Sequence, residues 1–268
     1  MSPDVMFLLG LVLKMAMTAA MVVSASVAAE RSGPFIAALI AALPTAAGAT
    51  YIILAIEHPP PFIAASAVAS IASNAAVAVF ALIYAALAQR HGLVLSLGVA
   101  TLVWFGAAAI LHLMPWTPLS ALLLNAVVFA VTIPLSARYR RAGVPPEAVV
   151  RTRYDLPLRA AAVAAVVALV TTASHWIGSF ASGVLALFPI VLGSFVVVIH
   201  PRAGGKAAAA VLARVEPALV GLALGFLGVH YLAESIDVWW SLAAGLAITM
   251  GWSGLLWLGR RLRVRVRA

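Results

Sequence analysis

Four ionisable side chains interrupt the apolar stretches of this 268-residue sequence, and they are the groups best placed to do chemistry. Lys14 follows nine apolar or small residues, so a helix places it roughly 14 Å from the start of its stretch. If that stretch spans a membrane, a cation there costs about 2.5–3.5 kcal/mol and should meet a partner inside the protein. The other three are Arg159, Arg214 and Glu216. Because three of the four are cations, the set favours a site for an anion.

Glu216 is the one acid that could lie deep within an apolar stretch. It is therefore the predicted counter-charge of Lys14 or Arg159 and the predicted proton carrier. Arg214 cannot pair with it on a regular helix, since residues two apart point to different faces. Three alternatives stay open. Lys14 could form a structural ion pair, Arg159 could mark the end of a span, and Arg214 and Glu216 could lie at the membrane interface.

Polar and helix-breaking residues extend this candidate site. Ser73 and Asn74 end a polar stretch and could donate hydrogen bonds to a substrate, although such residues also join membrane helices to one another. Pro44 and Pro189 lie in the middle of apolar stretches, where a proline removes a backbone hydrogen bond. The glycines four residues later are Gly48 and Gly193. Paired interruptions of this kind point to a transporter site, with a plain packing kink as the alternative.

Nothing in the sequence indicates a metal or a cofactor. The lack of cysteine excludes disulfides, thiolate catalysis and cysteine-based metal sites. Several histidines fall near acids at the ends of apolar stretches, but no two have the i, i+4 spacing of helical metal ligands. They are His58, His112, His175 and His230. We therefore expect polar residues at the membrane interface rather than a metal site.

The composition identifies the class of protein. Apolar residues make up 65% of the chain and charged residues 9%, against about 45–50% and 25% in soluble domains. Apolar stretches of about 20 residues recur throughout, which predicts an all-α polytopic integral membrane protein. We expect nine spans, namely Val5–Ala29, Pro34–Ile56, Phe62–Ala88, Gly92–Leu113, Trp116–Ala137, Leu158–Trp176, Gly178–Ile199, Ala207–Ala233 and Val238–Gly259.

The charges between these spans fall on alternate sides. One side carries all the basic loops, including Arg90, the Arg138–Arg153 loop and the Arg260–Arg267 tail, whereas the other carries only acids. The positive-inside rule then places the N-terminus outside and the C-terminus in the cytoplasm. The net charge of +9 reflects this topology rather than nucleic-acid binding. We expect a protein of the bacterial cytoplasmic (inner) membrane, with membrane lipids as partners.

A shift of 145 residues aligns spans one and two with spans six and seven without a gap. The matched pairs are Lys14 with Arg159, Gly33 with Gly178, Phe35 with Phe180, Pro44 with Pro189, and Gly48 with Gly193. Five spans separate equivalent elements, so the copies have opposite orientations, as in secondary transporters with a site between the repeats. The predicted organisation is a first repeat (1–137), a basic loop (138–156), a second repeat of four spans (157–259) and a basic tail (260–268). A duplication that only stabilises the bundle is the alternative.

Two families resemble these segments. Lys14, Glu30-Arg31 and Gly33 through Leu43-Pro44-Thr45 resemble the start of the small GlpM-type membrane proteins, which have a lysine in the first helix and a Leu-Pro or Phe-Pro step in the second. The second copy has Arg159 in the lysine's place and the step Leu187-Phe188-Pro189. The five-helix inverted repeat resembles the drug/metabolite transporter superfamily, but this chain lacks the last span of that ten-span plan. Neither resemblance implies a particular substrate.

These features predict a secondary transporter or exporter that moves a small anionic or anion-headed substrate by alternating access, with the proton as the candidate coupling ion. The expected anion ligands are Lys14, Arg159, Arg214, Ser73 and Asn74. The alternatives are a membrane-embedded enzyme acting on lipid and a non-transporting structural subunit of a membrane complex. Gly221 and Gly225 form a GxxxG element, which packs helices within a bundle or forms a homodimer.

Overall fold

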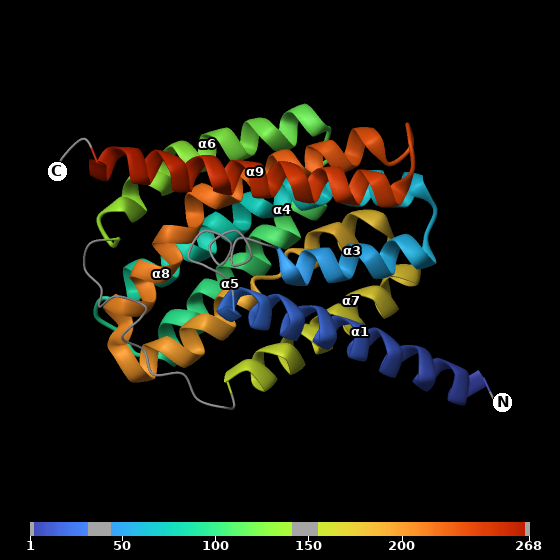
Figure 1. Ribbon diagram of the computed structural model, residues 1–268, viewed down its shortest axis with the longest axis horizontal. Coiled ribbons are helices and arrows are strands. Elements are labelled where there is room, and N and C mark those ends of the chain that lie inside the picture. Colours follow the sequence, from blue (N-terminus) through green and yellow to red (C-terminus); the bar gives the residue numbers. More distant parts are fainter. Residues whose placement is uncertain (1–2, 32–43, 141–154, 266–268) are drawn as a thin grey trace.

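The computed structural model describes residues 3–31, 44–140 and 155–265, and every regular element in these ranges is a helix (Figure 1). The helices are α1 (Pro3–Arg31), α3 (Thr45–Glu57), α4 (Pro60–Leu87), α5 (Leu93–His112), α6 (Pro118–Ala137), α7 (Asp155–Ala186), α8 (Ile190–Leu232) and α9 (Val238–Arg265). In the described ranges, six are long and apolar enough to cross a membrane, namely α4 to α9. The predicted class, a helical membrane protein, is confirmed at this level.

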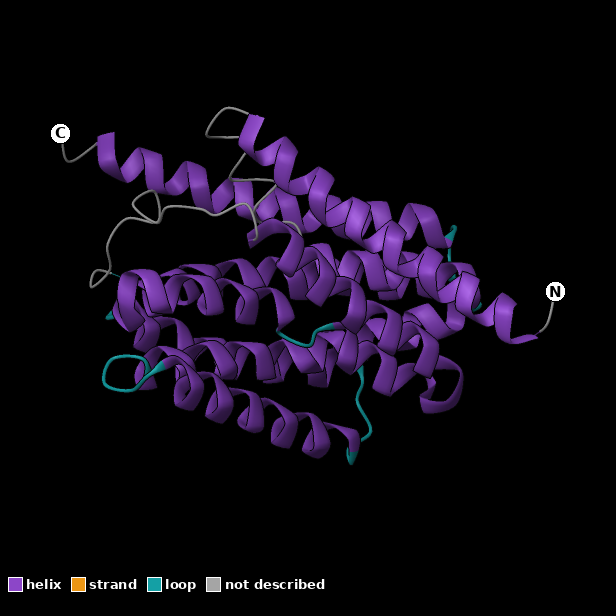
Figure 2. Ribbon diagram, turned by 90° about the horizontal axis from the view of Figure 1, so that it is seen from below, coloured by secondary structure: helices purple, strands orange, loops and turns teal. Residues whose placement is uncertain are grey.

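Helix α4 lies at the centre of the bundle and is almost wholly buried. It packs against α5, α6, α7 and α8, and Figure 2 shows most helices running along the long axis of the molecule. The outer helices α5, α6 and α9 expose large apolar side chains, such as Leu102, Leu123 and Leu246. Such an exterior suits the hydrocarbon core of a bilayer, in which backbone polar groups must be satisfied within the helices.

Glycine kinks replace two of the expected loops. The break predicted between Trp176 and Gly178 is a kink within α7, and the one predicted over His200–Gly205 is a kink within α8. The kinked residues, Gly178 and Gly204, have φ of 77° and 84°, a region in which a Cβ atom would be strained. The chain therefore changes direction within one residue at each point.

The predicted span Gly178–Ile199 contains the end of one helix and the start of the next. Helix α7 ends at Ala186, and Pro189 caps the start of α8. Proline fits this position because the first residues of a helix have no intrahelical partner for their backbone N–H groups. Of the predicted span Pro34–Ile56, only the part from Pro44 onward lies within the described residues.

The beginnings of α3 and α8 have the same local geometry. Pro44 precedes α3 with φ −76° and ψ 67°, and Pro189 precedes α8 with φ −74° and ψ 43°. In each case the proline carbonyl accepts a hydrogen bond from the glycine four residues later, at 2.7 Å from Gly48 and 2.8 Å from Gly193. The expected interruptions at Pro44 and Pro189 are therefore breaks that separate one helix from the next.

Small residues allow the inner helices to approach closely. A Cβ atom at Gly225 of α8 would lie 2.6 Å from the carbonyl oxygen of Gly245 in α9, and one at Gly221 would collide with Trp252. The GxxxG element therefore packs α8 against α9 within this chain.

Candidate functional site

Lys14 meets an acid, but a different one from that expected. Its Nζ lies 2.7 Å from Oε1 of Glu57, the last residue of α3, and the two side chains are 17% and 21% exposed. This corrects the prediction that Glu216 is the counter-charge of Lys14, whereas its pairing with Arg159, the other expectation, stays a prediction. The sequence did not indicate Glu57 as the partner of Lys14, because Glu57 precedes a proline-rich turn and was expected in a loop.

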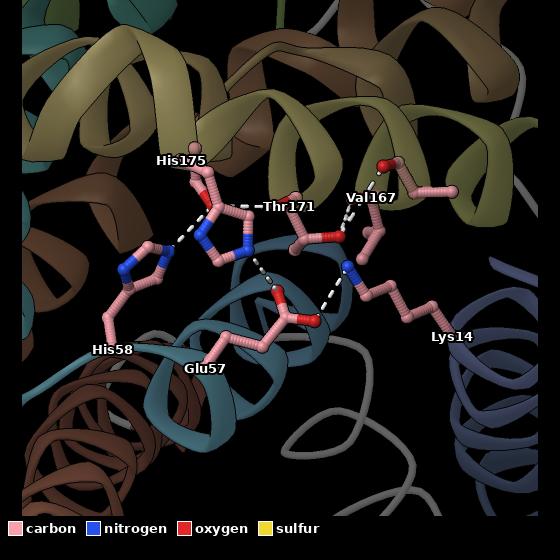
Figure 3. Close-up of polar contacts among 8 residues, drawn as sticks. Lys14, Glu57, His58, Val167, Thr171 and His175 are labelled. Atoms are coloured by element: carbon pink, nitrogen blue, oxygen red, sulfur yellow. Dashed lines mark hydrogen bonds and ion pairs between the residues drawn. The ribbon is translucent and has the colours of Figure 1, made fainter. Parts of the chain in front are cut away.

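Histidines complete a cluster at the end of the bundle where α3 turns into α4 (Figure 3). His175 Nε2 of α7 lies 3.8 Å from Glu57 Oε2, and His58 Nε2 lies 2.7 Å from the Ser174 hydroxyl oxygen. We call Lys14, Glu57, His58, Ser174 and His175 the rim cluster. Burial, together with the charges of His175 and Lys14, lowers the pKa of His58 against an opposing effect of Glu57, so its neutral form is favoured.

The remaining histidines near acidic loops lie apart from this cluster. The His112 ring lies 5.7 Å from the ring of Phe180, measured between centroids, and His230 Nδ1 lies 2.9 Å from the carbonyl oxygen of Ala64. Sequence reasoning missed the association of His58 with His175 because they come from segments more than a hundred residues apart and share no helical spacing.

A cavity of about 410 Å³ lies where the two proline breaks meet. Pro44 and Thr45 line it from one break and Pro189 from the other, while α8 contributes Arg214 and α9 contributes Ser253. The remaining lining is mostly apolar. The Thr45 hydroxyl oxygen is buried and has no hydrogen-bond partner among the described residues. A charged group and an unpaired hydroxyl thus lie at the edge of an apolar space.

Two helix N-termini also lie at this cavity. Ala46 and Ala47 in the first turn of α3 line it, as do Val191 and Leu192 in the first turn of α8. Backbone N–H groups in a first turn have no intrahelical acceptor, and the helix dipole gives them a partial positive charge. With Arg214 beside them, they make the cavity suitable for an anionic group.

The two predicted arginine ligands lie near this space in different ways. Arg214 is a lining residue, and its Nη2 lies 3.4 Å from the carbonyl oxygen of Arg140. The guanidinium of Arg159 lies 4.3 Å from the centroid of the Phe195 ring, and that ring lines the cavity. Lys14 is not among the lining residues, so the structure does not bring the predicted cations together.

Glu216 is fully buried in α8. Neither carboxyl oxygen has hydrogen-bond geometry with a partner in the described part of the chain, but Ser136 and Arg140 lie near enough to interact with it. Whether this residue lies at the midplane or at the interface stays a prediction, because burial within the bundle is compatible with either depth. Its role in proton coupling stays a prediction.

Ser73 and Asn74 are fully buried in α4 and bond to neighbouring helices. The Ser73 hydroxyl donates to the carbonyl oxygen of Val184 at 3.1 Å. The Asn74 amide donates to Asn125 Oδ1 at 3.0 Å and to the carbonyl oxygen of Leu219 at 2.9 Å. These contacts match the helix-packing alternative, and substrate binding by the two residues stays a prediction.

The long apolar helices define a helical membrane protein, with a cavity between its two proline breaks. No protein family model, curated protein or solved structure matches the chain. The resemblances to GlpM-type proteins and to drug/metabolite transporters therefore stay predictions.

Proposed function

We propose that this protein is a secondary membrane transporter that moves a small anionic or anion-headed substrate through the cavity between the two proline breaks. The observation that carries this proposal is the shared lining of that cavity. The first turns of α3 and α8 and the Arg214 side chain all border one space. Transporter sites formed by interrupted helices bind anionic substrate groups at half-helix N-termini in this way.

The lining also favours a particular kind of substrate. Arg214 and the backbone N–H groups would bind the anionic head, and apolar side chains such as Leu187, Leu219 and Leu222 would surround an apolar remainder. A fully solvated inorganic anion would leave this apolar lining unused. An organic anion of low molecular mass therefore fits the cavity best.

The inverted repeat belongs to the same proposal. At the 145-residue shift, the two break prolines coincide, and so do the glycines whose N–H groups bond to them. Helices equivalent at a similar shift, such as α1 with α7 and α4 with α8, are packing neighbours. An axis relating two inverted copies would bring equivalent helices together in this manner. Opening toward each side of the membrane in turn would follow from exchanging the conformations of the copies.

Proton coupling is assigned to Glu216. The Glu216 carboxyl group is buried, two residues along α8 from Arg214. Arg140 links the two residues, because its carbonyl oxygen accepts a hydrogen bond from Arg214 and its charge acts on Glu216. Protonation of Glu216 would release Arg140 from that interaction and thereby change the surroundings of the Arg214 guanidinium. A ligand is transported only if the two open states bind it with different affinity, and this linkage supplies such a difference.

The binding test uses purified protein in nanodiscs and a panel of organic monoanions and dianions, from acetate to long-chain carboxylates. Binding is read from thermal stability and from the change in total tryptophan fluorescence, to which the lining residue Trp257 contributes. We expect at least one anion to bind, and Arg214→Gln to weaken its binding at least about tenfold. Arg90→Gln, at an exposed arginine in the turn after α4, is the matched control and should leave binding unchanged. Anion binding that survives Arg214→Gln would refute the assignment.

The transport test uses cysteine labelling, since the chain contains no cysteine. Ser253→Cys places a thiol at the cavity, whereas Ser73→Cys places one in a fully buried contact. An impermeant thiol reagent should label the cysteine at position 253 from either side of sealed proteoliposomes, and the one at position 73 from neither. Labelling of position 253 from one side only, under all conditions, would argue against alternating access.

A further inference from the structure

The rim cluster brings together three side chains of metal-ligand type from two segments of the chain. Glu57 ends α3, His58 begins the turn to α4, and His175 belongs to α7. One ligand atom from each lies within 4.8 Å of the others. Figure 3 shows the imidazole of His175 between that of His58 and the Glu57 carboxylate.

One carboxylate oxygen in this cluster lacks a donor in the part of the chain that the structure describes. Glu57 Oε1 is taken by Lys14, whereas Oε2 is buried and has no hydrogen-bond partner among the described residues. A buried acceptor without a partner costs about 1–3 kcal/mol, so the arrangement gains from any group that satisfies it. Its neighbour at 3.8 Å is His175 Nε2, which is itself a metal-ligand atom.

The His58 ring is held in place by its surroundings. Its Nε2 lies 2.7 Å from the Ser174 hydroxyl oxygen, which in turn donates to the carbonyl oxygen of Thr171 at 2.6 Å. One face of the His58 ring stacks on the Phe62 ring, with ring centroids 3.8 Å apart and planes 6° from parallel. The stacking fixes the plane of the ring, and an ion would replace the hydrogen bond to Ser174 at Nε2, the nitrogen that faces His175 in Figure 3.

We propose that the rim cluster binds one divalent transition-metal ion of the Zn²⁺ type, with His58, His175 and Glu57 as its ligands. Two imidazoles and one carboxylate suit zinc and its neighbours rather than Mg²⁺ or Ca²⁺, which prefer oxygen ligands. Zinc bonds of about 2.0–2.2 Å place tetrahedral ligand atoms roughly 3.4 Å apart. The ligand atoms, now within 4.8 Å of one another, would have to approach to that separation, and a water molecule would be the fourth ligand.

This metal site is independent of the proposed transport function, since none of its residues lines the cavity. The ion would connect α3 and the α3–α4 turn to α7 at one end of the bundle. Lys14 opposes it, because the ammonium group neutralises the same carboxylate and repels a dication. Replacing Lys14 with a neutral side chain should therefore strengthen metal binding, whereas a purely structural ion-pair cluster would gain no affinity for metal.

The test measures metal binding by the full-length chain in nanodiscs, without a histidine tag and after treatment with a chelator. Zn²⁺ is titrated by calorimetry, and Co²⁺ is followed through its visible absorption bands. We expect one ion per chain and at least about tenfold weaker binding in His58→Gln and in His175→Gln. The His175 side chain is 51% exposed, so its substitution should not disturb folding. Lys14→Met should bind at least about threefold more tightly than the native chain.

His112→Gln is the matched control, because this histidine lies outside the cluster. The proposal is overturned if neither ion binds, if binding survives both cluster substitutions, or if His112→Gln weakens binding to the same extent. Loss of metal binding in Lys14→Met would also count against the proposal, provided that this variant unfolds at the same temperature as the native chain. Anion binding at the cavity should be unchanged in all these variants, so the outcome does not depend on the transport proposal.

Discussion

Replacing Gly183 with alanine should separate α7 from α4. The added Cβ would lie 2.8 Å from the carbonyl carbon of Ser66 and 2.9 Å from the Ala69 Cβ, and it would overlap the Ser66 carbonyl oxygen. Carbon atoms in ordinary contact are about 3.5–4.0 Å apart, so the helices must move by at least roughly 0.7 Å. Backbone atoms cannot rotate aside as a flexible side chain would.

That movement would also weaken the hydrogen bonds across the same contact. Ser66, Ser70 and Ser73 donate to carbonyl oxygens of α7 at 2.9, 2.7 and 3.1 Å. Overpacking costs about 1–3 kcal/mol, and each interhelical bond in a membrane protein contributes about 0.6 kcal/mol. Alanine regains about 1 kcal/mol through its greater helix propensity. If all three bonds are lost, the expected net loss in the free energy of unfolding is about 2–4 kcal/mol.

The assay is unfolding in mixed micelles by titration with a denaturing detergent, followed through tryptophan fluorescence. Gly106→Ala in α5 is the matched control, because its Cβ would meet nothing within 4 Å. The control should be as stable as the native chain or slightly more so. If Gly183→Ala unfolds at the same detergent fraction as Gly106→Ala, then the close approach of α7 to α4 does not limit stability and the reasoning fails.

Three further predictions concern contacts elsewhere in the bundle. Lys14→Met and Glu57→Gln should each destabilise the protein by about 1 kcal/mol and show a coupling of at least about 0.5 kcal/mol in a double-mutant cycle; strictly additive effects would contradict the ion pair. Asn125→Ala should lower the free energy of unfolding by about 1–3 kcal/mol, because the Asn125 amide donates to the carbonyl oxygen of Ile71 at 2.6 Å and its oxygen accepts from the Asn74 amide. An unchanged unfolding midpoint would exclude this network. Gly225→Ala should cost about 1–3 kcal/mol by forcing α8 from α9, whereas Gly251→Ala, with open space around its Cβ, should not; equal stability of the two variants would refute the close contact.

The sequence predicts those features that depend on local chemistry. Hydropathy predicts the long apolar helices α4 to α9 of the described ranges, because a membrane helix must be apolar along its own length. The breaks at Pro44 and Pro189 are visible because proline lacks a backbone N–H group wherever it occurs. Features that depend on distant segments are not visible. The pairing of Lys14 with Glu57 and the approach of His58 to His175 arise only when α1, α3 and α7 pack together.

The hydroxyl groups along α4 have a consequence for how the protein is made. Their acceptors in α7 follow 111–113 residues later in the chain, so they do not exist when α4 first leaves the ribosome. Until α7 enters the bilayer, each serine must turn back to a carbonyl group of its own helix. The helices up to α6 therefore cannot complete their interhelical hydrogen bonds until α7 has been made and inserted. A gene cut between α6 and α7 should yield two fragments that are stable only when they are produced together.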